Sequence, residues 1–235
     1  IPSATTAVGD GAFRNCEQVR AVTFQSSDQE ISFGANVFEG CFRLVRVNLP
    51  ASLSYFDGSV FAGCESITTI VVDPANKNFA VHENALYSKD YSELLFYPRM
   101  LSGDLSELHP NVQKIGNKVF QGNPKITEVT FGSKIVSIGE GAFENCHELT
   151  KVSFKSSTGA VTIGASAFAK CVMLTSIELP KTTTTIGARA FENAGLSTFV
   201  IPENVTYLGV RALAGTQIQS IIIPANMETI CDGAF

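Results

Sequence analysis

The sequence predicts a β-rich solenoid, a stack of short repeats with a parallel sheet along its concave face. Three observations support this prediction: a phenylalanine that recurs at nearly constant spacing, an apolar strand pattern that usually ends in proline, and a second short pattern that ends in glycine. The composition agrees with a packed interior, because 45% of the 235 residues are hydrophobic and only 17% are charged.

The recurring phenylalanine lies in a motif that reads GAFxxC in its fullest form. We name this residue the anchor; its copies are Phe13, Phe38, Phe61, Phe120, Phe143, Phe168, Phe191, Leu213 and Phe235. The intervals are 22 to 25 residues except for one of 59 residues between Phe61 and Phe120. A unit this short cannot bury its own apolar face, so each repeat must stack on the next. We expect the anchor motif to form short helical turns.

A strand pattern, LxxIxL, follows each anchor. Examples are LVRVNLP (44–50), LTSIELP (174–180), LSTFVIP (196–202) and IQSIIIP (218–224). Alternation of apolar and polar residues predicts half-buried strands, which stack ~4.8 Å apart as one parallel sheet. A second short strand ends in glycine about seven residues after the proline, as in TTTTIG (182–187). We expect this glycine to supply a backbone angle that a Cβ would resist.

The 59-residue interval contains a predicted insertion, residues 75–103. There ALYS (85–88) and ELLFYP (93–98) flank the polar turn KDYS, which predicts a β-hairpin. The region is aromatic, with Phe79, Tyr87, Tyr91, Phe96 and Tyr97, and two interpretations stay open: interface anchors, or rings that fix the hairpin to its scaffold. We expect a single solenoid over residues 1–235. Both ends fall inside a repeat, which suggests a segment of a longer protein.

The motif GAFENCHEL places Cys146, His147 and Glu148 side by side, the composition of a thiolate site. The same position in other repeats holds unrelated residues, so we predict no catalytic residue and no enzyme. Phe143, Cys146, Phe168 and Cys171 are instead predicted to be structural core residues, with the cysteines reduced. One or two disulfides between coils are the less favoured alternative. No CxxC or HExxH pattern supports a metal site, and no cofactor is expected.

Charge and hydropathy exclude two classes of partner. The net charge is −5 and the 17 basic residues are scattered, which argues against nucleic acid. No run approaches the roughly 18 apolar residues of a membrane span, so direct membrane insertion is not expected. Residues 1–13 lack the pattern of a signal peptide.

The repeat CVMLTSIELPKTTTTIGARAF (171–191) resembles the BspA-like class of leucine-rich repeat, and the resemblance covers essentially the whole chain. That class includes surface proteins of bacteria and parasitic protists, some implicated in adhesion and virulence. The resemblance therefore implies a cell-surface or secreted location and a protein or glycan ligand, such as a host extracellular-matrix or cell-surface protein.

We predict that ligand binding uses the outward residues of the LxxIxL strands and the hairpin. The candidates are Arg46, Thr69, Glu128, Lys151, Glu178, Tyr87, Tyr91 and Tyr97. The expected function is a non-catalytic interaction module that adheres to host or neighbouring-cell macromolecules. The alternative is a structural spacer that displays other domains, and a plain solvated face also accounts for the hydroxyl-rich strands.

Overall fold

The computed structural model describes residues 1–56, 59–99, 101, 105 and 108–235. The chain divides into two compact units, Ile1–Leu101 and Ser102–Phe235, and each is described by itself. Within the described residues every regular element is a β-strand, and no helix is long and apolar enough to cross a membrane.

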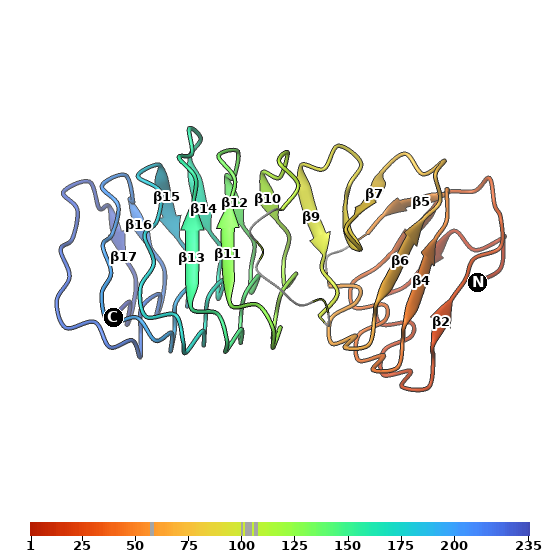
Figure 1. Cartoon of the computed structure of the whole chain (residues 1–235), viewed down its shortest axis with the longest axis horizontal. Coiled ribbons are helices and arrows are strands. Elements are labelled where there is room, and N and C mark those ends of the chain that lie inside the picture. The colour runs from red at the N-terminus through yellow and green to blue at the C-terminus, as the bar shows by residue number, and fades with distance from the viewer. Residues whose placement is uncertain (57–58, 100, 102–104, 106–107) are drawn as a thin grey trace. The chain divides into compact units, whose positions relative to one another are not determined.

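Each coil of the first unit contributes one short strand to each of two parallel sheets. The strands of the glycine-ending pattern are β1 (Ala7–Val8), β3 (Ile31–Phe33) and β5 (Leu53–Tyr55). The LxxIxL strands are β2 (Ala21–Val22), β4 (Arg46–Leu49) and β6 (Thr69–Val72), visible as successive coils in Figure 1. One coil therefore corresponds to one sequence repeat, as the spacing of the anchors predicts.

An antiparallel meander ends the first unit. It consists of β7 (Phe79–His82), β8 (Ala85–Ser88) and β9 (Glu93–Phe96). The last two strands are the hairpin that the sequence predicts, with its turn at 89–92, and β7 adds a third strand. The buried side chain of Asn76 holds the entry to β7, because its Nδ2 donates to the Pro50 carbonyl at 2.8 Å while its Oδ1 accepts from Phe79 N at 2.8 Å.

The second unit repeats the parallel pattern. Its longest sheet contains β10 (Lys114–Ile115), β12 (Ser137–Ile138), β14 (Val161–Ile163), β15 (Thr183–Ile186), β16 (Tyr207–Leu208) and β17 (Thr229–Ile230). On the LxxIxL side, the strands paired among the described residues of this unit are β11 (Glu128–Phe131) and β13 (Lys151–Phe154). The two sets of strands are distinct in Figure 1.

The expectation of LxxIxL strands in every coil is wrong for the last three coils. Residues 174–180, 196–202 and 218–224 lie in coils that are fully described, yet they form no strand. The burial pattern of a strand persists in the first two of these coils, since Ile177, Leu179, Phe199 and Ile201 are all buried. Burial of alternate side chains needs only the core beneath them, whereas a ladder also needs main chains about 4.8 Å apart.

The anchor motifs form irregular turns, so the expectation of short helical turns is also wrong. Residues two places before and two places after an anchor have positive φ, for example Gly141 (58°) and Asn145 (59°) around Phe143. A left-handed residue interrupts a right-handed helix. The turn instead bonds to the next coil, where Phe143 N donates to the Ala167 carbonyl at 2.7 Å.

The anchor rings form two stacks, one in each unit. The ring centroids of Phe13, Phe38 and Phe61 lie 5.2 and 5.6 Å apart in sequence order. In the second unit, the successive distances along Phe120, Phe143, Phe168 and Phe191 are 4.7, 5.3 and 5.4 Å. These offset stacks add ~0.5–1.5 kcal/mol per pair to the burial of the rings.

The repeated glycine has a different reason from the one expected. Gly187 has no positive φ, but a Cβ on it would lie 2.7 Å from both Ala165 N and Gly164 C of the preceding coil. Gly139 meets the preceding main chain in the same way, 2.7 Å from Gly116 C. The glycine is thus required because adjacent coils approach closely, a use typical of glycine where two backbones meet.

Candidate functional site

The LxxIxL face is the candidate binding surface. We use this name for the outward residues of β4, β6, β11 and β13 and of the segments 174–180, 196–202 and 218–224. Strand geometry aims alternate side chains to opposite sides, so Val129 and Val152 enter the core while Glu128 and Lys151 face outward. Of the residues that the sequence proposes for binding, five lie on such strands or segments of their own unit, namely Arg46, Thr69, Glu128, Lys151 and Glu178. The three proposed tyrosines lie in or next to the meander.

Glu128 and Lys151 form an ion pair across adjacent coils. The two residues are register partners, and Lys151 Nζ lies 3.0 Å from Glu128 Oε2. Both side chains are about half exposed, so the pair is screened by water and stabilises the fold by at most ~1 kcal/mol. Each charge has its partner already, which leaves little net field at this point of the surface.

Arg46 and Thr69 are register partners in the first unit. Arg46 Nε donates to Asn48 Oδ1 at 3.0 Å on the same strand. The structure therefore brings Arg46 next to Thr69, and separately Glu128 next to Lys151, within their own units.

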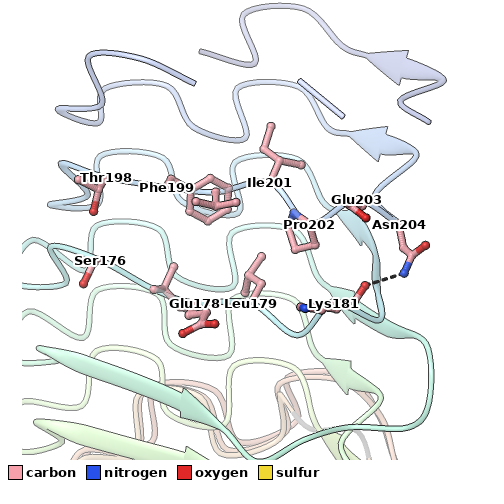
Figure 2. Close-up of a pocket in the computed structure, with 12 residues that line it drawn as sticks. Ser176, Glu178, Leu179, Lys181, Thr198, Phe199, Ile201, Pro202, Glu203 and Asn204 are labelled. Atoms are coloured by element: carbon pink, nitrogen blue, oxygen red, sulfur yellow. Dashed lines mark hydrogen bonds between the residues drawn. The ribbon is translucent and has the colours of Figure 1, made fainter. Parts of the chain in front are cut away.

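Glu178 lies beside an open groove. The groove has a volume of about 590 Å³ and runs between residues 176–181 of one coil and 198–204 of the next. Figure 2 shows Leu179 on one coil and Phe199 and Ile201 on the other. One end is bridged, because Asn204 Nδ2 donates to the Lys181 carbonyl at 2.7 Å, the dashed bond in Figure 2. Sequence reasoning did not find this groove, since the strand pattern continues unchanged through it.

Apolar side chains are exposed on the same face, at the second outward position of the LxxIxL repeat, which is the residue just before the final apolar residue of the pattern. Val200 is 80% exposed and Ile222 is 86% exposed, on adjacent coils of the second unit, and Val71 occupies the same column of the first unit at 39%. Solvated strands usually carry polar residues at such positions, so these side chains are available for contact with another molecule.

The three tyrosines of the meander differ in exposure. Tyr87 is only 2% exposed and packs against the ring of Tyr91 at a centroid distance of 5.8 Å. Tyr91 and Tyr97 are half-buried. Burial, and secondarily the carboxylate of Glu83, raises the pKa of Tyr97. Of the two sequence interpretations, Tyr87 follows the packing one, so it does not protrude.

The buried cysteines of the anchor motif donate hydrogen bonds to main-chain carbonyls of the preceding coil. Cys146 is fully buried, and its Sγ donates to the Phe120 carbonyl of the preceding coil at 3.0 Å. Cys171 bonds to the Phe143 carbonyl in the same way at 3.1 Å, and burial raises its pKa. His147 and Glu148 are exposed on the other side of the chain, so the three neighbouring residues do not converge on one point.

No disulfide joins the cysteines, all six of which are free. In the parts of the chain that the structure describes, no three His, Cys, Asp or Glu side chains gather as metal ligands. A thiol that is buried and hydrogen-bonded behaves as a small core side chain.

The comparisons identify the repeats. The pattern of the BspA type leucine rich repeat region matches residues 1–98 and 110–235, as six copies. A comparison with curated proteins finds no significant match.

Several solved structures have the same fold. The pneumococcal vaccine antigen PcpA is 22% identical with a TM-score of 0.80, over 97% of this chain and 60% of that one. A leucine rich cell surface protein of Faecalibacterium prausnitzii is 20% identical with a TM-score of 0.64, over 94% and 77%. A leucine-rich repeat protein of Eubacterium ventriosum is 19% identical with a TM-score of 0.53, over 92% and 81%.

The chain thus spans about three fifths of the length of PcpA, and these identities establish the fold alone. The family pattern covers nearly all of the sequence. The repeated residues of this pattern form the stacked anchor rings, the short paired strands and the row of free cysteines in the anchor motifs. This chain belongs to the BspA-type leucine-rich repeat family.

Proposed function

We propose that this chain is a non-catalytic interaction module of a cell-surface or secreted protein, which adheres to a host or neighbouring-cell protein through the LxxIxL face. The exposure of Val200 and Ile222 carries the proposal, because adjacent large apolar side chains on a solvated face mark contact sites. Two structural neighbours, a vaccine antigen and a cell surface protein, support the surface location.

The proposal assigns different roles to the residues of the surface. Val200 and Ile222 supply apolar contact, and Glu178 supplies a charge without an ion-pair partner among the described residues. The paired Glu128 and Lys151, like Arg46 and Thr69, supply the polar surroundings that steer a ligand more than they hold it. In the meander, Tyr91 and Tyr97 are the residues left for contact, since Tyr87 is buried.

The test replaces the exposed apolar side chains by threonine, a β-branched polar residue. Val200→Thr and Ile222→Thr together keep the β-branched shape and remove apolar contact, so we expect at least a tenfold loss of adhesion, about 1.4 kcal/mol. Adhesion is measured on epithelial cells and on wells coated with fibronectin, laminin or collagen. Tyr91→Ala and Tyr97→Ala test the meander in the same assay.

A matched control carries Val172→Thr and Val210→Thr. These residues are also exposed, at 51% and 40%, but lie away from the LxxIxL face. The control should adhere like the unmodified chain. Equal adhesion of both double variants would contradict the assignment of the face. Absence of adhesion by the unmodified chain on every surface would favour a structural spacer.

A further inference from the structure

Three exposed arginines, Arg43, Arg20 and Arg46, lie on adjacent coils of the first unit, and we name them the arginine row. Arg20 immediately precedes β2, and Arg46 begins β4, the next strand of the same parallel sheet (Figure 1). The two main chains meet here, because Val45 N and Arg46 N donate to the Arg20 carbonyl at 2.9 and 3.3 Å. Arg43 reaches back to the coil of Arg20, since its Nη1 donates to Gln18 Oε1 at 2.9 Å. Cations that are separated in the sequence therefore lie together on the surface.

The positive charge of the arginine row is not neutralised by carboxylates. None of its guanidinium groups forms an ion pair with the described residues. Carboxylates of the neighbouring turns have other partners, because Glu39 pairs with Arg14 at 2.7 Å and Glu65 pairs with Arg99 at 2.6 Å. Glu17, the acidic residue nearest to the row along the chain, forms no ion pair with it. Like charges held close together repel, so an external anion would stabilise this part of the surface.

Most hydrogen-bond donors of the arginine row are left for a ligand. Each guanidinium carries five N–H donors in a planar fork. Within the described part of the unit, the side chains of the row donate two hydrogen bonds, from Arg43 Nη1 to Gln18 Oε1 and from Arg46 Nε to Asn48 Oδ1. Both acceptors are neutral amides. Because the three arginines are exposed, the other donors match an anion with several acceptor oxygens, which guanidinium binds through paired hydrogen bonds.

The residues around the arginine row are suited to contact with sugar rings. Thr68 and Thr69 lie on the following coil, where Thr68 N donates to the Val45 carbonyl at 3.0 Å and Thr69 is the register partner of Arg46. Their hydroxyls can exchange hydrogen bonds with sugar hydroxyls. Phe42 and Val45 are 45% and 40% exposed, and such side chains gain by covering the C–H faces of a pyranose ring.

We infer that the arginine row binds a sulfated polysaccharide of the glycosaminoglycan class, through contacts between guanidinium and sulfate groups. The row follows the direction of the chain across two coils, from Arg43 in the turn to Arg46 on β4, so it matches sulfates repeated along a linear polymer. A nucleic-acid strand is a poorer match, because its bases need successive aromatic platforms. The inference goes beyond the proposed function, since it adds a second ligand apart from the apolar contact through Val200 and Ile222.

Titration of a heparin oligosaccharide tests the ligand class. The probe is a fluorescently labelled heparin dodecasaccharide, and its anisotropy is followed as the chain is added at several salt concentrations. The slope of log Kd against log salt should be about 2–3, because each neutralised sulfate releases about 0.7–0.9 of a counterion. Arg20→Gln, Arg43→Gln and Arg46→Gln together should weaken binding at least ~10-fold and reduce this slope below ~1. Absence of saturable binding by the unmodified chain at roughly 0.15 M salt would overturn the inference.

A charge-matched control separates the arginine row from the general charge of the chain. It carries Lys114→Gln, Lys155→Gln and Lys170→Gln, which remove equally many positive charges from exposed positions of the second unit. This variant should bind heparin like the unmodified chain, and equal weakening by both triple variants would refute the role of the row. Replacing the three arginines of the row by lysine keeps the charge and loses the planar fork, so the affinity should be intermediate and the salt slope unchanged. Equal urea midpoints of all variants show that the losses are not caused by unfolding.

Competing polyanions test the choice of a sulfated glycan. Desulfated heparin keeps the sugar chain and its carboxylates, and it should not displace the labelled probe. Polyglutamate and oligothymidine of equal charge should compete at least ~10-fold more weakly than heparin, because charge alone is not the basis of recognition. Equal competition by polyglutamate would indicate an acidic protein ligand and equal competition by oligothymidine a nucleic acid, and either would overturn the inference. Adhesion that depends on Val200 and Ile222 while heparin fails to bind removes only the glycan ligand and leaves the proposed function intact.

Discussion

Truncation of a central anchor ring is the strongest test of the stacked core. Phe143 is fully buried, and its ring lies 4.7 Å from the Phe120 ring and 5.3 Å from the Phe168 ring, with Phe131 edge-on at 5.9 Å. Phe→Ala in a core costs ~3–5 kcal/mol. Two stacked neighbours and one edge contact, each worth ~0.5–1.5 kcal/mol, place Phe143→Ala at the upper end, about 5 kcal/mol.

Urea unfolding followed by circular dichroism measures this loss. With a slope of roughly 2 kcal/mol per molar urea, the midpoint of the second unit should fall by about 2.5 M. Phe235→Ala is the matched control, because Phe235 is an anchor of the same unit that is 54% exposed, and it should change stability by less than ~0.5 kcal/mol. A loss for Phe143→Ala below ~1.5 kcal/mol, or one equal to that of the control, would refute the stacked-core reasoning.

Two further predictions concern the coil contacts. Gly187→Ala should destabilise the fold by ~1–3 kcal/mol, because its Cβ would meet main chain at 2.7 Å, whereas Gly9→Ala, with no atom within 4 Å, should be neutral in the same urea assay. If both variants unfold alike, close coil approach is not the reason for the glycine. Burial raises the pKa of Cys64 from 9.0 to about 12, so the folded state holds this proton more tightly than the unfolded chain. The resulting stability is complete below pH 9 and is lost as the pH rises from 9 toward 12. Urea midpoints of Cys64→Ala should therefore fall less steeply over that window than those of the unmodified chain, and parallel curves would contradict the prediction.

The periodic part of the fold could be predicted because every repeat has nearly the same pattern of apolar and polar residues. An anchor every 22 to 25 residues must stack on its copies to be buried, and the structure has ring stacks in both units. The hairpin at 85–96 was also predictable, since a polar turn between two apolar runs is a local signal. The turns around the anchors are not helical, and the sequence does not reveal this, because their left-handed residues include Lys118 and Arg189, residue types that do not indicate a positive φ.

The sequence predicts which residues of successive repeats occupy equivalent outward positions, but it does not predict the contacts that their side chains make. Glu128 and Lys151 lie one repeat apart at the same position, so their proximity follows from the alignment of the repeats. The burial of Tyr87 could not be predicted from the repeats, because it depends on how the meander packs. The open groove beside Glu178 was equally hidden, since the residues around it keep the alternation of a paired strand.

The sequence by itself determined the repeat unit, the direction of its side chains and the family, because these depend on spacing and polarity along the chain. Only the tertiary structure decided which coils approach closely enough to bond. The close coil contact at Gly187 and the groove lined by Glu178 and Val200 occur in neighbouring coils of nearly identical pattern. The distance between two coils results from the packing of all their side chains together, so the sequence of a single repeat does not determine it.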